Sequence, residues 1–308
     1  MCRMTVLQNL VLTTIVSFFT SCEKDFDINL KPNKPLLIVE GYINNELPSY
    51  NYVILGRSQD YFNTDFENIA VTGAKVSVTE GRLLPNNTYE WNAASKKELT
   101  EARIPLLDYA LVPGLYFDPA LITDPADALM GRPGYHYLLE IEADGKKYSA
   151  TTAMLPPVRV DSLTIGNYYN DDLDDGSIVL KGRITVHYKD PDTIGNTQLY
   201  YWQAQSEGPH FGWGGMGAGR YSPGTDDLVN GQYIRLTHGG GFVMGDSVIY
   251  HMASVERKVY NFWDSFNKAR ANGGPFSTPA TISSTISGED VLGCFSGFSL
   301  SSKAVRIK

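Results

Sequence analysis

Apolar and polar residues alternate with a period of two along several short runs in the first half of the chain. The clearest run is Ala74–Thr79, which ends at Glu80-Gly81, and such alternation is typical of a strand with one buried face. Asp144-Gly145 separates two further runs, and this dipeptide is typical of a two-residue hairpin turn. We therefore expect antiparallel strands joined by tight turns. The expected strands are Leu36–Ile43, Tyr52–Leu55, Ala74–Thr79, Tyr135–Ala143 and Lys147–Thr152.

The boundaries of this strand-rich part are marked by prolines. Residues 105–134 hold five of the 16 prolines and few strand signals, so we expect a long loop with a short helical turn near Ala126–Met130. Pro156-Pro157 cannot donate to a strand ladder and is the best domain boundary. Val71–Val78 resembles the immunoglobulin-like modules that are common on bacterial surfaces. Residues 35–156 are therefore predicted to form an immunoglobulin-like antiparallel β-sandwich.

The second half, residues 157–308, reads as another β-rich domain with one packed helix. Apolar residues recur at helical spacing over about 255–271, Ser254 is the expected N-cap, and Asn272–Pro275 ends the helix. The whole chain is thus predicted to be mainly β. The expected strands of this half are Val160–Ile165, Ile178–Leu180, Ile184–Tyr188, Gln198–Gln205, Gln232–Thr237, Ser247–His251, Ala280–Ile286 and Phe295–Ile307.

A different pattern occupies the first 21 residues, which we interpret as a lipoprotein signal peptide. Arg3 is followed by the apolar stretch Leu10–Phe19, which is too short to cross a bilayer. The stretch ends Phe19-Thr20-Ser21-Cys22, which resembles a bacterial lipobox, although Leu is usual where Phe19 stands. In that class Cys22 becomes the N-terminus and carries acyl chains such as palmitate. The alternative is a buried N-terminal helix with an incidental cysteine.

Residues 22–34 are predicted to be a polar tether. Glu23-Lys24-Asp25-Phe26-Asp27 resembles the acidic signal that exports Bacteroidetes lipoproteins to the outer face of the outer membrane, although lipoprotein tethers are often simply polar. Cleavage before Cys22 leaves 287 residues, with Cys294 as the other cysteine. Intrachain disulfides are therefore not expected, and Cys294 is predicted to be a small buried residue.

Composition narrows the function classes. The chain has 308 residues, is 43% hydrophobic and 12% aromatic, and has only 19% charged residues with a net charge of −8. This balance excludes a disordered chain, a coiled coil and a basic nucleic-acid binder, so no nucleic-acid partner is expected. The acidic charge also disfavours docking onto anionic lipid, which leaves the acyl anchor as the expected membrane contact.

Two glycine-rich segments resemble functional motifs, but the sequence around each of them lacks the other parts of the motif. Residues 212–217 match G-x-G-x-x-G, but no helix is expected after them, so a flexible loop is favoured over nucleotide binding. Phe211, Trp213 and Tyr221 in or beside this loop are candidate contacts for a glycan or peptide ligand, although a loop that packs its own aromatic side chains is favoured. His238–Gly241 resembles a lipase oxyanion loop but lacks a nucleophile elbow, so a tight hairpin or bulge is favoured.

Ionisable residues form no convincing catalytic or metal-binding pattern. Asp171–Gly176 concentrates carboxylates, but Leu173 breaks the calcium-loop register and a solvated loop is favoured. The five histidines are scattered without zinc-ligand spacing. No cofactor, metal or catalytic residue is therefore predicted, and the chain is not expected to be an enzyme.

Several stretches in order are similar to one family, the domain-of-unknown-function lipoproteins of Bacteroidetes. They include Cys22 with its acidic tether, Tyr135–Leu163, the helix at Ser254–Phe266 and Pro279–Ile307 with its Leu292–Phe295 motif. These lipoproteins are often encoded beside TonB-dependent outer-membrane transporters. The resemblance implies an outer-membrane lipoprotein with such a transporter as partner, and it implies no catalytic residue.

The leading hypothesis is therefore a non-enzymatic binding or accessory module, anchored by Cys22 and facing the cell exterior. A surface hydrolase of glycan or peptide is the alternative, and it requires a clustered carboxylate pair or a Ser/His/Asp arrangement in one cleft. A structural adhesin is the third hypothesis, and it predicts a molecule without a concave pocket.

Overall fold

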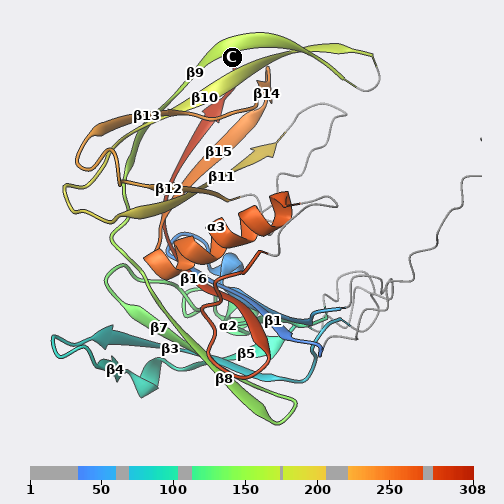
Figure 1. The fold of residues 1–308 in the computed structure, drawn as a ribbon, viewed down its shortest axis with the longest axis vertical. Coiled ribbons are helices and arrows are strands. Elements are labelled where there is room, and N and C mark those ends of the chain that lie inside the picture. The colour runs from blue at the N-terminus through green and yellow to red at the C-terminus, as the bar shows by residue number, and fades with distance from the viewer. Residues whose placement is uncertain (1–33, 60–68, 103–112, 174–175, 206–220, 273–279) are drawn as a thin grey trace, which may run out of the picture. The chain divides into compact units, whose positions relative to one another are not determined.

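The computed structural model describes residues 34–59, 69–102, 113–173, 176–205, 221–272 and 280–308. Residues 34–308 form one compact unit. The described residues are mainly in β-strands, with one long helix, which confirms the predicted fold class (Figure 1).

The strands of the first half are β1 (Leu37–Asn44), β2 (Tyr52–Arg57), β3 (Lys75–Leu83), β4 (Tyr89–Trp91), β5 (Lys97–Glu101), β6 (Leu115–Phe117), β7 (His136–Ala143) and β8 (Lys146–Ala153). Short helical turns are η1 (Pro48–Tyr50), η2 (Ala93–Ser95) and α2 (Ala120–Thr123). The later elements are β9 (Val160–Asp172), β10 (Ile178–Lys189), β11 (Thr197–Gln205), β12 (Ser222–Thr225), β13 (Tyr233–Thr237), β14 (Phe242–Val243), β15 (Ser247–Ser254), α3 (Arg257–Ala271) and β16 (Val291–Arg306).

The first-half strands form a sandwich around one apolar core. The path β16-β1-β2-β6-β5-β3-β7-β8 folds back through β5, which pairs with both β6 and β3. Along β7 the residues Tyr137, Leu139 and Ile141 are buried in this core, while the residues between them face solvent. Asp144 and Gly145 both have positive φ, as a type I′ hairpin turn requires, so the predicted turn is confirmed.

A second pair of sheets encloses another core. Strands β12-β11-β15 and the C-terminal half of β16 form one layer, and β9, β10, β13 and β14 form the other. Ile184 and Val186 of β10 pack against Val248 and Met252 of β15 between these layers. The same period-two alternation thus supplies apolar faces to both cores.

Strand β16 belongs to both halves of the molecule. Residues 291–298 pair parallel with β1, and residues 299–306 pair antiparallel with β15 (Figure 1). The sequence had indicated antiparallel pairing, and β1–β16 is the parallel pair among the described strands. The predicted boundary at Pro156-Pro157 falls in the connection between β8 and β9, yet the last strand returns to the first-half sandwich.

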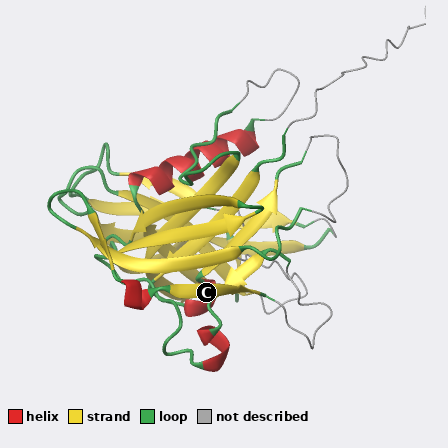
Figure 2. Cartoon of the chain, turned by 90° about the horizontal axis from the view of Figure 1, so that it is seen from below, coloured by secondary structure: helices red, strands yellow, loops and turns green. Residues whose placement is uncertain are grey.

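Helix α3 packs on the outer face of the strands, on the opposite side of β11 and β15 from the second core (Figures 1 and 2). Val259, Phe262 and Trp263 are its buried residues, as their helical spacing predicts. The predicted N-cap was wrong, because Ser254 ends β15 and its hydroxyl accepts a hydrogen bond from the Val158 amide. Glu256 occupies the N-cap position instead.

Local differences from the predictions lie mostly in irregular segments. The proline-rich segment holds strand β6, and its helical turn is α2 rather than Ala126–Met130. Ala280–Ile286 is not a strand, although Ser287 just beyond it forms an isolated bridge with Ser149. Short elements like β6 depend on their partners more than on their own pattern.

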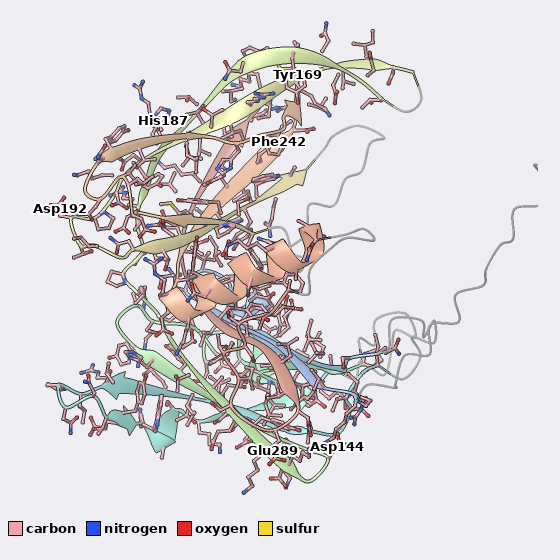
Figure 3. The ribbon with its side chains drawn as sticks, in the orientation of Figure 1. Asp144, Tyr169, His187, Asp192, Phe242 and Glu289 are labelled. Atoms are coloured by element: carbon pink, nitrogen blue, oxygen red, sulfur yellow. The ribbon has the colours of Figure 1, made fainter. Side chains whose placement is uncertain are left out.

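An ion cluster links the segments just before β1 and β16 to the start of β8. The Asp290 carboxylate, just before β16, contacts the Lys34 ammonium near β1 and lies 2.8 Å from the Lys146 Nζ of β8. Hydrogen bonds from Lys146 and Lys34 lower the pKa of Asp290. The neighbouring residues Asp144 and Glu289 are at this end of the sandwich, far from Tyr169 and Phe242 (Figure 3).

Candidate functional site

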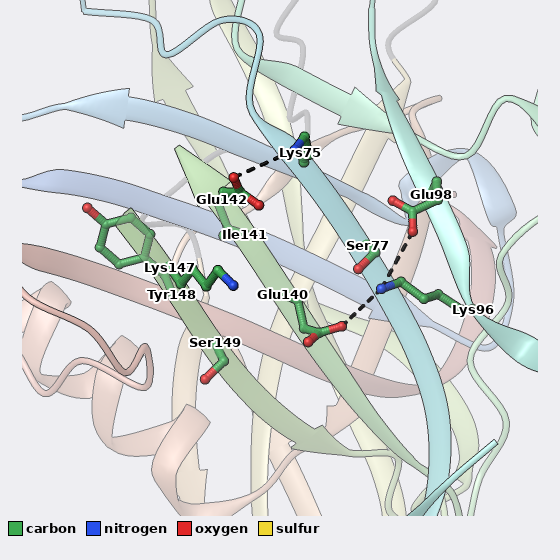
Figure 4. Close-up of a pocket in the computed structure, with 10 residues that line it drawn as sticks. All are labelled: Lys75, Ser77, Lys96, Glu98, Glu140, Ile141, Glu142, Lys147, Tyr148 and Ser149. Atoms are coloured by element: carbon green, nitrogen blue, oxygen red, sulfur yellow. Dashed lines mark hydrogen bonds and ion pairs between the residues drawn. The ribbon is translucent and has the colours of Figure 1, made fainter. Parts of the chain in front are cut away.

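Two hollows on the first-half sandwich are the candidate binding surfaces of the described residues. The first, which we call the charged hollow, has a volume of about 410 Å³ and lies over the outer face of β3, β7 and β8 (Figure 4). Outward-facing residues of these strands and of β5 form most of its lining, together with the core residues Ile141 and Tyr148. Its charged residues are Lys75, Lys96, Lys147, Glu98, Glu140 and Glu142.

Most charged side chains in the charged hollow form ion pairs with one another. Lys96 Nζ lies 3.2 Å from Glu140 Oε2 and 3.5 Å from Glu98 Oε1, and Lys75 Nζ lies 3.6 Å from Glu142 Oε1 (Figure 4). The hydrogen bond to Glu140 raises the pKa of Lys96. These groups are exposed, so each pair contributes less than about 1 kcal/mol. The charged hollow is therefore a solvated, mixed-charge sheet face.

The second hollow, which we call the arginine–tyrosine hollow, has a volume of about 500 Å³ and lies where β3 and β4 end. Its lining residues come from β3, β4, η2 and the segment before β7. They are Glu80, Gly81, Arg82, Glu90, Trp91, Asn92, Ala93, Arg132 and Tyr135.

A tight turn brings two of these residues together. The Tyr135 amide donates to the Arg132 carbonyl oxygen at 3.2 Å, with Pro133 and Gly134 between them. Gly134 has φ +87°, so the segment has the proline and glycine positions of a type II turn. As a result the Arg132 guanidinium lies 4.1 Å from the centre of the Tyr135 ring.

Glu80 fixes the position of Arg132. The Glu80 carboxylate accepts a hydrogen bond from Arg132 Nε at 2.7 Å, a second from the other arm of that guanidinium, and one from the Tyr137 hydroxyl at 2.9 Å. Its side chain is 10% exposed, so the pair is partly desolvated. Hydrogen bonding to Glu80 raises the pKa of Arg132, and burial raises that of Tyr137.

Arg82 contacts the same tyrosine, Tyr135, but forms fewer interactions with acidic groups than Arg132 does. Its guanidinium lies 4.7 Å from the centre of the Tyr135 ring and donates to the Tyr135 hydroxyl at 2.5 Å. This hydrogen bond raises the pKa of Arg82. No ion pair joins Arg82 to a carboxylate of the described residues, although Glu90 is its cross-strand neighbour. The hollow therefore contains one arginine that is paired with an acid and one that is not.

The predicted aromatic ligand contacts are not assembled as a surface in the described residues. Phe211 and Trp213 lie outside those residues, as does the G-x-G-x-x-G segment. Tyr221 is 3% exposed and packs edge-on against Tyr201 and Trp263, at ring-centre distances of 5.2 and 4.5 Å. Its ring belongs to the core beneath α3, where it lines a cavity of about 10 Å³ that is too small for a glycan or peptide ligand.

Two other features that the sequence indicated are the lipid-anchor cysteine and the glycine-rich segment His238–Gly241. Cys22, with the signal peptide, lies outside the described residues. The segment His238–Gly241 connects β13 to β14, and Gly240 has φ +86°. Its histidine is buried, where His238 Nε2 lies 2.6 Å from the Tyr250 hydroxyl, so the loop serves the second core.

Three neighbouring side chains of the described residues, a buried histidine and a partly exposed serine and glutamate, are of the types found in a catalytic triad. His251 Nδ1 lies 2.6 Å from Ser302 Oγ, and that hydroxyl donates to Glu46 Oε2 at 2.6 Å. In a triad the histidine lies between serine and acid, whereas here the serine is in the middle. His251 is 3% exposed, and burial lowers its pKa to about 4. This geometry is that of a packed polar network.

Cys294 is buried in the core beneath α3, as the sequence predicted. Burial raises the pKa of its thiol to about 12. Within the described ranges no three His, Cys, Asp or Glu residues gather in a way that could hold a metal ion. The helices in those ranges are also too short or too polar to cross a membrane.

Sequence reasoning missed the arginine–tyrosine hollow. The dipeptide Pro133-Gly134 was a usable signal, because it predicts a type II turn that places Arg132 near Tyr135. Nothing local could indicate that Glu80 and Arg82 lie against that turn, since they are about 50 residues away in sequence.

Comparison with known protein families identifies one match. Residues 23–304 match the family described as a domain of unknown function, DUF4249. Comparison with curated proteins gives no match, and neither does comparison with solved structures.

Proposed function

We propose, from the premise that this chain belongs to the DUF4249 family, that it is a lipid-anchored binding or accessory module of the outer-membrane surface. Acylated Cys22 would hold it, and a TonB-dependent transporter would be its partner. The observation that carries the proposal is where the family match begins, at residue 23, directly after Cys22. The matched residues 23–304 lie within residues 22–308, the chain that cleavage of the predicted signal peptide would leave.

The geometry of the compact unit is compatible with this role. Its first described residue is Lys34, close to the start of β1. The 11 residues between Cys22 and Lys34 can span at most about 40 Å. A domain on such a tether stays within reach of a neighbouring membrane protein. Its two hollows are lined mainly by residues of paired strands, which can hold a binding surface in place.

The anchor is tested by replacing Cys22. In cells that express the full chain, Cys22→Ala should abolish incorporation of labelled palmitate and release the protein from the membrane fraction, because the thiol that accepts the lipid is absent. Cys2→Ala, a cysteine in the same leader, is the matched control and should leave labelling unchanged. Labelling of Cys22→Ala at the wild-type level would refute the anchor.

Surface exposure and partnership need separate measurements. Protease added to intact cells should digest the wild-type protein without permeabilisation of the outer membrane. Protection until permeabilisation would contradict an outward orientation. Affinity purification in mild detergent should recover a TonB-dependent transporter with the wild-type protein, and recovery of none from cross-linked cells would contradict the partnership.

A further inference from the structure

We propose that the arginine–tyrosine hollow is a binding site for a small ligand with a single carboxylate, and that Arg82 makes the charged contact to it. The inference deepens the proposed binding role and rests on it, but it does not depend on the lipid anchor. Four features of the hollow carry it: an unpaired cation, a rigid support, a balanced lining charge and a suitable volume.

Arg82 has donors to spare. A guanidinium carries five N–H donors in one plane, and within the described residues Arg82 uses one arm, toward the Tyr135 hydroxyl. The guanidinium carbon lies 4.7 Å from the centre of the tyrosine ring, and the edges of the guanidinium that carry its other donors form no hydrogen bond with the described residues. Those edges match the two oxygens of a carboxylate in a bidentate pair.

The support of Arg82 is ordered before any ligand arrives. Tyr135 ends the turn through Pro133-Gly134, and its ring also carries the guanidinium of Arg132. Arg132 is in turn held by the nearly buried Glu80. A preformed site loses little conformational entropy on binding, which favours useful affinity from few contacts.

The charge of the lining selects among anions. Arg82 and Arg132 are balanced by Glu80 and Glu90, so the lining carries no formal net charge. A phosphate or another multivalent anion would be repelled by the carboxylates of Glu80 and Glu90. The lining has no net positive charge to offset this repulsion. A carboxylate needs just one guanidinium, and Arg82 is the one without an acidic partner in the described part of the chain.

The volume sets the size of the ligand. About 500 Å³ is within the range of small-molecule sites, roughly 300–1,000 Å³. A monosaccharide acid and an acylated amino acid are both small molecules with a single carboxylate. Either class of compound could therefore supply the group that Arg82 binds. D-glucuronate and N-acetylalanine are therefore the two probes, and inorganic phosphate is the comparison anion.

The test uses the full chain extracted from membranes in mild detergent, with dissociation constants measured by ligand-observed NMR. At least one carboxylate probe should bind, and Arg82→Gln should weaken that binding by about 10-fold or more, as expected for the loss of a charged hydrogen-bonded contact. Tyr135→Phe, which removes the hydroxyl that orients Arg82, should weaken it several-fold.

Arg183→Gln is the matched control, because Arg183 is also exposed and also lies over a tyrosine ring, 5.3 Å from the centre of Tyr169. It should bind the probes like the wild type. Binding of glucuronate alone, of N-acetylalanine alone, or of both would support the site and identify its source. The proposal is overturned if neither probe binds, if phosphate binds more tightly, or if Arg82→Gln retains wild-type affinity. Failure here would leave palmitate labelling at Cys22 unaffected, so the two proposals fail separately.

Discussion

At the residue scale, burial decides what each reactive side chain can do. Cys294 lies in the core beneath α3, and His251 is enclosed with Ser302, although both residue types are common in active sites. Tyr221 is likewise buried, which removes it from the surface that its glycine-rich neighbourhood indicated. Arg82 shows the opposite case. Its side chain is exposed and available for binding, although the residues around it in the sequence give no sign of a functional site.

Cys294 should be chemically inert in the folded protein. Burial excludes reagents and raises the pKa of the thiol to about 12, so the reactive thiolate is scarce near neutral pH. Iodoacetamide followed by peptide mass spectrometry should find Cys294 unmodified in native protein and fully modified in guanidinium chloride. Alkylation at equal rates in the two conditions would show that the thiol is accessible.

At the element scale, β16 is the strand on which both halves depend. Its first eight residues complete the sheet of β1, and its last eight complete the sheet of β15. The close approach of β1 and β16 depends on Gly293, which has φ +151°. A Cβ at this position would lie 1.9 Å from the Val39 carbonyl oxygen, which is far inside contact distance.

Gly293→Ala should therefore be strongly destabilising. Both the backbone conformation and the clash with Val39 oppose a methyl group, and we expect a loss of about 3 kcal/mol in the free energy of unfolding. Gly239→Ala is the control, since a Cβ there meets nothing within 4 Å, and it should change stability by less than about 0.5 kcal/mol. Urea denaturation measures both. Equal midpoints for the two variants would contradict this account of β16.

At the scale of the whole molecule, three apolar clusters and a set of buried polar groups share the stability. His238 and His251 sit in different clusters, beside Tyr250 and Tyr201 respectively. Burial lowers the pKa of each histidine to about 4, against about 6.5 in the unfolded chain. Both are therefore neutral in the folded protein where the unfolded chain would be protonated.

This difference gives stability a defined pH dependence. Between pH 6.5 and about 4 the unfolded state binds more protons, so the free energy of unfolding should fall as pH falls, by up to about 1.4 kcal/mol per pH unit for each histidine. Denaturation at pH 7, 6 and 5 measures the slope. The double variant His238→Gln, His251→Gln should flatten it. An unchanged slope in the double variant would assign the effect to other groups.

The sequence by itself determined the features that depend on neighbouring residues. Period-two alternation identified β3, Asp144-Gly145 identified the turn between β7 and β8, and helical spacing identified the buried face of α3. These features follow from backbone geometry and from which face is apolar, and both are properties of a short segment. The predicted lipid anchor at Cys22 is also a local pattern, and it awaits its labelling experiment.

Tertiary structure alone decided which distant segments meet. The pairing of β16 with β1 joins residues more than 250 positions apart, and an alternating pattern tells which face of a strand is buried but not which strand lies beside it. The same holds for Arg82 and Glu80 against Arg132 and Tyr135, whose contacts create the arginine–tyrosine hollow. A binding site is a meeting of chain segments, and that meeting is set by the packing of the whole molecule.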